Sequence, residues 1–212
     1  MSEAEPKSVA PMRIGIYGGA FDPPHLAHFA LAQAAVQQYA LDKLIALPTG
    51  QAWHKSRTLT RAEHRIAMVK LAFAELAQVR VDIRETQRSG PTYTLDTLQA
   101  LNAENPGAEL FLLMGGDQLA AFPQWHRYEE ILQIATLLVA LRADSMPAKG
   151  QKDLQNQGKI NRSIIFSTIL MPASPISATQ IRQLIAAKQP IDHLVKPTVA
   201  RYIAENRLYS IT

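Results

Sequence analysis

A glycine-rich segment with two histidines, residues 15–28, constrains the fold of this chain more than any other feature. Its sequence is Gly-Ile-Tyr-Gly-Gly-Ala-Phe-Asp-Pro-Pro-His-Leu-Ala-His. It joins a predicted strand over residues 13–17 to a predicted helix over residues 25–39, with Gly18 and Gly19 at the bend. Backbone N–H groups at a helix N-terminus attract anions, and glycine lets the chain pass close to a ligand. His25 and His28, three residues apart, share one helical face and can donate to the same phosphate oxygens.

The same residues allow other interpretations. A Gly-Gly bend after a strand is common, and a histidine pair at a helix start can simply cap the helix or be solvated there. His25 and His28 could also bind a metal, with Asp22 as the only nearby third ligand. The segment lacks the dinucleotide pattern Gly-x-Gly-x-x-Gly and the P-loop Gly-Lys-Ser/Thr, which argues against a dehydrogenase or a P-loop ATPase.

Short apolar runs alternate with helical patterns along the rest of the chain. Further strands are predicted over residues 43–47, 79–83, 109–114, 137–141 and 163–166. Further helices are predicted over 60–76 (opened by a Thr60–Glu63 capping box), 94–103, 128–133, 177–187 and 197–206. A loop is predicted over 84–92, and a loop or short helix over 142–162. This alternation predicts an α/β fold with a mainly parallel sheet flanked by helices and a small C-terminal helical part.

Length and composition exclude several classes of protein. The 212 residues are enough for one domain, predicted over residues 13–212 after a flexible tail over 1–12. No apolar stretch approaches the ~20 residues of a membrane span, so no membrane partner is expected. The absence of cysteine excludes disulfides and suits a cytoplasmic protein. The net charge of +4 is too mild to indicate a nucleic-acid partner and suits a phosphate-rich small substrate.

A second polar motif, Ser-Pro-Ile-Ser-Ala-Thr-Gln-Ile-Arg, covers residues 174–182. Ser177, Thr179 and Arg182 bring hydroxyls, helix N–H groups and a guanidinium into about one and a half helical turns, which suits a polyphosphate. Ser177 could instead do no more than cap the helix. This motif and the first one both follow predicted strands, and ligands of parallel sheets bind beyond the carboxyl ends of the strands.

At these two motifs the chain resembles the nucleotidyltransferase superfamily that transfers adenylyl groups, and within it the nicotinate-nucleotide adenylyltransferases. The patterns of that family are Gly-Gly-x-Phe-Asp-Pro-x-His-x-Gly-His and Ile-Ser-Ser-Thr-x-Ile-Arg, which correspond to residues 18–28 and 176–182. Further similar segments are His54-Lys55, residues 93–97, Gly116-Asp117, Trp125, and the ending 199–203 with Leu208-Tyr209. The resemblance spans about residues 13–209 and implies a Rossmann-like fold.

The resemblance implies that nicotinate mononucleotide attacks the α-phosphorus of ATP, releasing pyrophosphate and forming deamido-NAD without a covalent enzyme intermediate. Such chemistry depends mainly on positioning and on stabilisation of charge. The implied catalytic residues are His25, His28, Lys55 and Arg182. The implied ATP-binding residues are Gly18, Gly19, Phe21, His25, His28, Asp117, Ile176, Ser177, Thr179 and Arg182. Mg²⁺ would bridge phosphate oxygens with few protein ligands.

The acceptor side is assigned to Tyr93, Thr94, Trp125 and His126. An indole face is the best side-chain partner for a cationic pyridinium ring, so Trp125 is predicted to stack on the pyridinium ring of the substrate. The alternative is that Trp125 only packs against other side chains of the protein. The resemblance implies that Thr94 and backbone N–H groups near Trp125 and His126 hold the substrate carboxylate. Arg84 and Arg88 are looser candidates for electrostatic support.

Two departures from the family patterns keep other functions open. Ala27 stands where the family has glycine, and Ala178 stands where a hydroxyl is usual. Ala27 could crowd the adenosine, and Ala178 removes one potential phosphate contact. The alternatives are a related adenylyltransferase that uses nicotinamide mononucleotide or phosphopantetheine, and a non-catalytic nucleotide-binding regulator.

Overall fold

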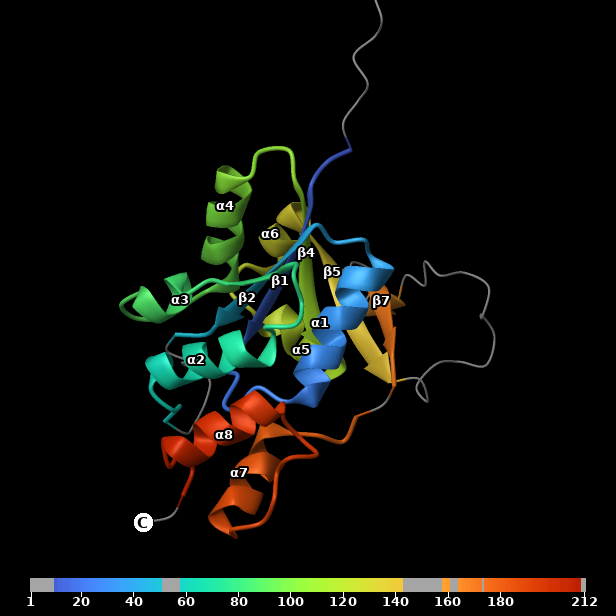
Figure 1. The fold of residues 1–212 in the computed structure, drawn as a ribbon. Coiled ribbons are helices and arrows are strands. Elements are labelled where there is room, and N and C mark those ends of the chain that lie inside the picture. Colours follow the sequence, from blue (N-terminus) through green and yellow to red (C-terminus); the bar gives the residue numbers. More distant parts are fainter. Residues whose placement is uncertain (1–9, 51–57, 143–157, 161–163, 173, 211–212) are drawn as a thin grey trace, which may run out of the picture.

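The computed structural model describes residues 10–50, 58–142, 158–160, 164–172 and 174–210 (Figure 1). A seven-stranded sheet has the order β3-β2-β1-β4-β5-β7-β6. Its strands are β1 (Arg13–Gly19), β2 (Lys43–Pro48), β3 (Val79–Val81), β4 (Glu109–Gly115), β5 (Ala135–Arg142), β6 (Gly158–Ile160) and β7 (Ile164–Met171). Every pairing is parallel except that of β6 with β7. The predicted α/β fold is therefore confirmed.

Helices cover both faces of this sheet. They are α1 (Leu26–Gln38), α2 (Ala62–Ala72), α3 (Arg84–Gln87), α4 (Thr94–Glu104), α5 (Gly116–Ala121), η1 (Phe122–Gln124), α6 (Tyr128–Ile134), α7 (Ala178–Ala186) and α8 (Pro197–Glu205). Side chains alternate across each strand, so Ile14 and Ile16 pack toward α4 and α6 while Tyr17 packs toward α1 and α2. Among the described residues, none of the helices has the length and apolar character needed to span a membrane.

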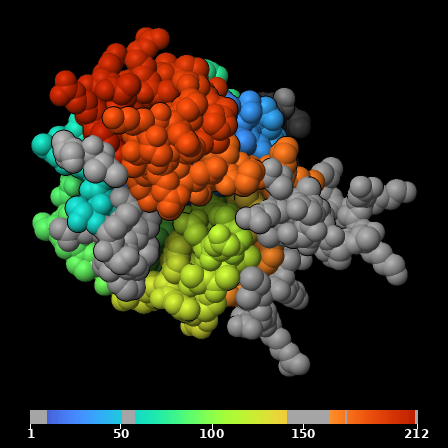
Figure 2. Space-filling model, turned by 90° about the horizontal axis from the view of Figure 1, so that it is seen from below, coloured from blue at the N-terminus to red at the C-terminus, as the bar shows by residue number. Residues whose placement is uncertain are grey.

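The two C-terminal helices form a separate apolar cluster with α2. Met68 and Ala72 of α2 pack against Ile181 of α7 and against Val199 and Ile203 of α8. Figure 1 shows α7 and α8 below the sheet, on the side toward which the strand arrowheads point, and Figure 2 shows this C-terminal part as one orange and red mass next to the segment of α5 and α6. The small C-terminal helical part is confirmed, and it lies at the carboxyl end of the sheet.

Some local predictions were wrong. Gly18 and Gly19 are the last residues of β1 rather than the bend, which follows them. Thr60 does not cap α2, whose N-cap is Arg61 without a side-chain bond. The Thr60 N–H, which Glu63 would accept in a capping box, donates to Asp22. The predicted loop over 84–92 contains α3, and the predicted loop or short helix over 142–162 contains β6, whose strand character comes from pairing with β7.

Other boundaries differ by a few residues or were missed. The strand predicted over 163–166 extends to Met171 as β7, and the segment after β4 forms α5 and η1, for which no helix was predicted. The remaining predicted strands and helices are found within a few residues of their predicted limits. Most of the predicted N-terminal tail lies outside the described residues.

Candidate active site

A cavity of about 550 Å³ opens at the carboxyl ends of the parallel strands. It lies between β1 and β4, which are neighbours in the sheet although β2 and β3 come between them in the sequence. At this position the strand order reverses, and open parallel sheets bind their ligands at such a point. Seven residues that the sequence assigned to a site line it together: Gly18, Gly19, Tyr93, Thr94, Asp117, Trp125 and His126. The structure therefore brings these residues together around one cavity.

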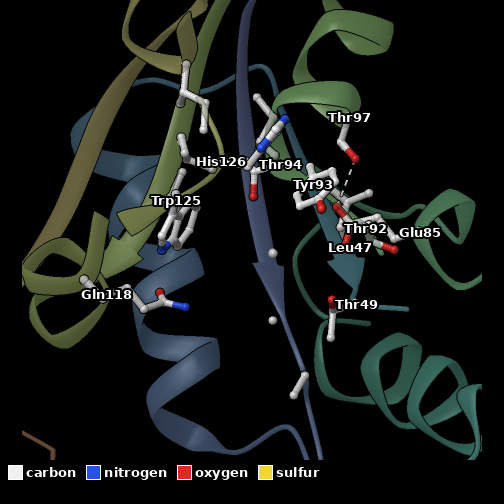
Figure 3. Close-up of a pocket in the computed structure, with 18 of the residues that line it drawn as sticks. Leu47, Thr49, Glu85, Thr92, Tyr93, Thr94, Thr97, Gln118, Trp125 and His126 are labelled. Carbon is white, nitrogen blue, oxygen red and sulfur yellow. Dashed lines mark hydrogen bonds between the residues drawn. The ribbon is translucent and has the colours of Figure 1, made fainter. Parts of the chain in front are cut away.

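The cavity has one aromatic wall and one polar wall (Figure 3). Trp125 and Gln118 lie on the first wall, and Thr49, Glu85 and Thr97 lie on the second. Trp125 is half-buried and packs against Phe122 with 5.4 Å between ring centroids. Its indole therefore has a fixed packing partner on one side while still lining the cavity, as a stacking platform requires.

The rings of Tyr93 and His126 stack on each other with 4.3 Å between centroids and 28° between planes. Tyr93 is the N-cap residue of α4, and His126 follows η1, so the stack joins the two walls. The stacked rings therefore connect the start of α4 to the segment after η1 at the edge of the cavity.

Glu85 was not foreseen as a site residue. Its side chain is 7% exposed and lines the cavity, and it accepts a hydrogen bond from the Thr97 hydroxyl at 3.0 Å. Arg88 donates in turn to the Thr97 oxygen at 2.9 Å. Burial raises the pKa of Glu85, although Thr97 and the charge of Arg88 act in the opposite direction. Only its position in α3, which the sequence did not predict, brings it to this wall.

Of the two looser arginine candidates, only Arg88 is connected to the cavity wall. Arg84 forms ion pairs with Asp82 at 2.7 Å and Glu104 at 2.8 Å. These carboxylates raise the pKa of the guanidinium further above its usual value. Arg84 is thus engaged by two carboxylates that do not line the cavity.

The two motif histidines lie at the start of α1 and stack on each other with 3.7 Å between ring centroids. The His25 backbone N–H donates to His28 Nδ1 at 3.1 Å. This bond assigns Nδ1 of a neutral His28 as an acceptor and puts its proton on Nε2, which becomes a donor. The interpretation of the pair as a helix cap is therefore correct for His28, whose Nε2 carries the ring proton.

His25 is 8% exposed, and its Nδ1 has no hydrogen-bond partner among the described residues. Burial lowers its pKa to about 4. His25 is thus neutral near pH 7 and can contribute a hydrogen bond rather than a full positive charge. A buried polar atom without a partner at a candidate anion site is the kind of atom that a ligand can satisfy.

The buried His25 predicts a specific dependence of stability on pH. Between pH 6.5 and pH 4 the unfolded chain binds a proton at this residue that the folded chain does not bind. The free energy of unfolding should therefore fall by about 3 kcal/mol as the pH is lowered through this window. Urea unfolding at pH 7 and pH 4.5 should show that His25→Asn removes most of this loss, whereas His193→Asn, at an exposed position, keeps it. An unchanged pH dependence in His25→Asn would contradict the assignment.

The second motif meets the first at Asp22. Arg182 donates to the Asp22 backbone carbonyl oxygen at 2.7 Å and to the Thr179 hydroxyl oxygen at 3.1 Å. Asp22 and Arg182 are 160 positions apart in the chain. The predicted convergence of the two motifs is therefore found, three residues before His25. Arg182, His25 and His28 do not line the cavity itself.

The remaining predicted residues have separate positions. Phe21 is buried against Tyr17, His28 and Phe73, so it supports the segment rather than lining the cavity. Ser177 accepts a hydrogen bond from the Gln180 backbone N–H at 3.2 Å and thus does cap α7. Ile176 packs against the cluster of α2, α7 and α8. Lys55 and the neighbouring His54 lie outside the described residues.

The residues described by the structure do not include any group of three or more histidine, aspartate or glutamate side chains arranged to hold a metal ion. Within the proposed His25, His28 and Asp22 set, His28 Nδ1 and both Asp22 carboxylate oxygens already accept hydrogen bonds. These contacts engage three of the atoms that such a metal site would use.

Comparisons with known proteins found a matching family and several related sequences. A family model described as cytidylyltransferase-like matches residues 16–184. A protein of Albidiferax ferrireducens described as a probable nicotinate-nucleotide adenylyltransferase is 52% identical over 197 residues, covering 93% of this chain and 98% of its own length. A protein of Methylibium petroleiphilum with the same description is 40% identical over 202 residues, covering 93% and 92%.

Solved structures share the fold. The nicotinic acid mononucleotide adenylyltransferase of Plasmodium falciparum, solved in complexes with APC and with NaAD, superposes with a TM-score of 0.70 at 19% identity. The match covers 93% of this chain and 97% of that one.

Proposed function

The chain belongs to the cytidylyltransferase-like family, and we infer from this membership and from its site that it is a nicotinate-nucleotide adenylyltransferase. It transfers the adenylyl group of ATP to nicotinate mononucleotide, giving deamido-NAD and pyrophosphate, a step of NAD biosynthesis. The structural observation that carries this function is the meeting of two distant motifs at Asp22 and Arg182 beside a cavity lined by Tyr93, Thr94 and Trp125.

The reaction forms one bond and breaks one bond at phosphorus. A phosphate oxygen of nicotinate mononucleotide attacks the α-phosphorus of ATP, and the bond to the bridging oxygen of pyrophosphate breaks. The enzyme needs to align the two phosphates and to stabilise charge, so hydrogen-bond donors matter more than a nucleophile. We expect Mg²⁺ to enter as the ATP complex, since Mg²⁺ is commonly held through substrate phosphates and water.

We propose that His28 Nε2–H, Arg182 and the backbone N–H groups at the start of α7 donate to the ATP phosphates. His25 would add a neutral donor, and Ser177 and Thr179 would lie beside them. The geometry supports this because Arg182 and the two histidines are tied to the same short segment through Asp22 and the His25 N–H. Lys55 and Ile176 remain proposals from the resemblance.

We further propose that the pyridinium ring stacks on Trp125 and that Thr94, Tyr93 and backbone N–H groups near His126 hold the nicotinate carboxylate. Asp117 and Gly18 would face the nucleoside of ATP on the same cavity lining. The cysteine-free composition is compatible with the cytoplasm as the place of action, which we also propose.

Gly18 offers a test of how closely the nucleotide approaches β1. A Cβ added at Gly18 would meet no described atom within 4 Å, so Gly18→Ala should leave thermal stability almost unchanged. Because Gly18 lines the cavity, the added methyl group should raise the Michaelis constant for ATP about tenfold. The comparison variant is Gly50→Ala, whose Cβ would overlap the Glu85 backbone carbonyl and should lower stability. An unchanged Michaelis constant in a stable Gly18→Ala protein would place the nucleotide elsewhere.

The direct test of function is pyrophosphate release from ATP and Mg²⁺ with three acceptors in parallel: nicotinate mononucleotide, nicotinamide mononucleotide and phosphopantetheine. Release with the nicotinate form is the expected result. Release only with another acceptor would keep the adenylyl transfer and overturn the assignment of the acceptor pocket. ATP binding without release for any acceptor would indicate the regulator and direct attention to Ala27 and Ala178.

A further inference from the structure

The carboxylate of Asp22 joins the start of the site to the end of the chain. Asp22 is 1% exposed. Its Oδ1 accepts a hydrogen bond from the Tyr209 hydroxyl at 2.6 Å, and its Oδ2 accepts from the Thr60 N–H at 3.2 Å. Tyr209 and Asp22 are 187 positions apart. A buried carboxylate is costly unless hydrogen bonds compensate its lost hydration, so these donors matter for the segment that carries it.

The segment around Asp22 is held by groups from several elements. Arg65 of α2 donates to the Ala20 carbonyl oxygen at 3.0 Å and to the Thr60 carbonyl oxygen at 2.8 Å. Arg182 of α7 donates to the Asp22 carbonyl oxygen at 2.7 Å. The Tyr209 hydroxyl thus completes a set of bonds that fixes the backbone directly before His25.

The C-terminal segment adopts an unusual backbone conformation to place this hydroxyl. Arg207 has φ +50° and Tyr209 has φ +63°, values that residues other than glycine rarely adopt. Leu208 and Tyr209 pack against the cluster formed by α2, α7 and α8, which can offset the local strain. Burial and the neighbouring Asp22 carboxylate raise the pKa of Tyr209 above its ordinary value, so the hydroxyl keeps its proton.

We propose that Tyr209 is a positioning residue for the phosphate end of the active site. Its hydroxyl fixes the Asp22 carboxylate, and the same segment determines where Arg182 bonds and where His25 and His28 begin α1. This inference rests on the proposed function for its catalytic consequence, but its effect on nucleotide binding can be measured separately. It assigns a role to the Leu208-Tyr209 ending, which adenylyl transfer alone does not explain.

The test compares Tyr209→Phe with Tyr202→Phe. Each change removes one hydroxyl from the C-terminal part of the chain, and Tyr202 hydrogen-bonds His64 Nδ1 at 3.0 Å rather than Asp22. Binding of a non-hydrolysable ATP analogue with Mg²⁺ should weaken about tenfold in Tyr209→Phe, as expected for a lost hydrogen bond to a charged group. In Tyr209→Phe the Michaelis constant for ATP should rise by a similar factor, and the Michaelis constant for nicotinate mononucleotide should change less than twofold. Tyr202→Phe should match the parent protein in analogue affinity and in both Michaelis constants.

A double variant separates positioning from a general loss of stability. If Tyr209 acts through Asp22, Tyr209→Phe should weaken analogue binding much less in an Asp22→Asn protein than in the parent. Independent, multiplying effects would overturn the proposal, as would equal effects of Tyr209→Phe and Tyr202→Phe. Thermal unfolding of each variant shows whether the compared proteins are folded at the assay temperature.

The two proposals fail in distinguishable ways. If the parent protein releases no pyrophosphate with nicotinate mononucleotide but binds the ATP analogue, the proposed function fails and the binding comparison still decides the role of Tyr209. If the parent protein is active and Tyr209→Phe behaves like Tyr202→Phe, only the role of Tyr209 is wrong. A parent protein that does not bind the analogue would overturn both.

Discussion

Replacing His28 by alanine is expected to lower kcat by about 100- to 1,000-fold, the usual cost of removing a donor that faces charge developing in a transition state. Several contacts fix the ring: Nδ1 accepts the His25 N–H at 3.1 Å, the two imidazoles stack at 3.7 Å, and Phe21 packs against the ring with 5.1 Å between centroids. A donor held in this way needs little reorganisation during the reaction, so its loss should appear mainly in turnover.

The alanine change also removes a helix cap, and a second variant separates the two effects. A glutamine at the third helical position can accept the N-cap N–H, as in a capping box. His28→Gln should therefore recover most of the stability lost in His28→Ala while turnover stays low. Steady-state kinetics and thermal unfolding of both variants, with His64→Ala in α2 as a remote histidine control, would measure this. Near-normal turnover in a folded His28→Ala protein would exclude a role in transition-state stabilisation.

Replacing Trp125 by alanine is expected to raise the Michaelis constant for nicotinate mononucleotide about 10- to 100-fold, given the usual strength of a desolvated cation–π contact together with lost apolar contact. Trp125 lines the cavity while its ring packs against Phe122 at 5.4 Å. The Michaelis constant for ATP should change less than threefold, because the proposed phosphate contacts lie around Asp22 rather than on this wall.

The control for this experiment is Trp125→Phe, which keeps an aromatic face of smaller area. It should recover a large part of the acceptor affinity, because a phenyl ring also attracts a cation, though less strongly than indole. Initial rates measured over a matrix of ATP and acceptor concentrations separate the two constants. Equal increases in both constants would indicate that Trp125 supports the packing of η1 and α6 instead of binding the acceptor.

Local sequence was sufficient for the parts of the fold that depend on short-range patterns. The run of apolar residues in 109–114 and the alanine-rich pattern after His25 correspond to β4 and α1 within one residue. The Gly18–His28 motif predicted a strand-to-helix connection, and in the structure Gly18 and Gly19 end β1 while His25 and His28 lie at the start of α1. The parallel arrangement of the strands also followed from the alternation of strands and helices along the sequence, because two neighbouring parallel strands need a crossover connection between them.

The sequence could not indicate which groups would occupy hydrogen-bonding positions that come from distant parts of the chain. Thr60 looked like a helix cap, but its N–H bonds Asp22, a residue 38 positions away. Arg84 looked like a candidate for the acceptor, but Asp82 and Glu104 engage it. In both cases the residue bonds a group from another part of the fold instead of taking the role that its residue type suggested.

By itself, the sequence determined that this protein has an α/β sheet with two polar motifs near its carboxyl end, and it predicted Trp125 as the aromatic residue of the site. Only the tertiary structure decided that Glu85 faces the cavity, that β6 pairs with β7, and that Tyr209 bonds Asp22. Periodicity and motif spacing report the interactions of residues a few positions apart. Contacts across 187 positions arise only when packed helices and strands bring the two ends of the chain together.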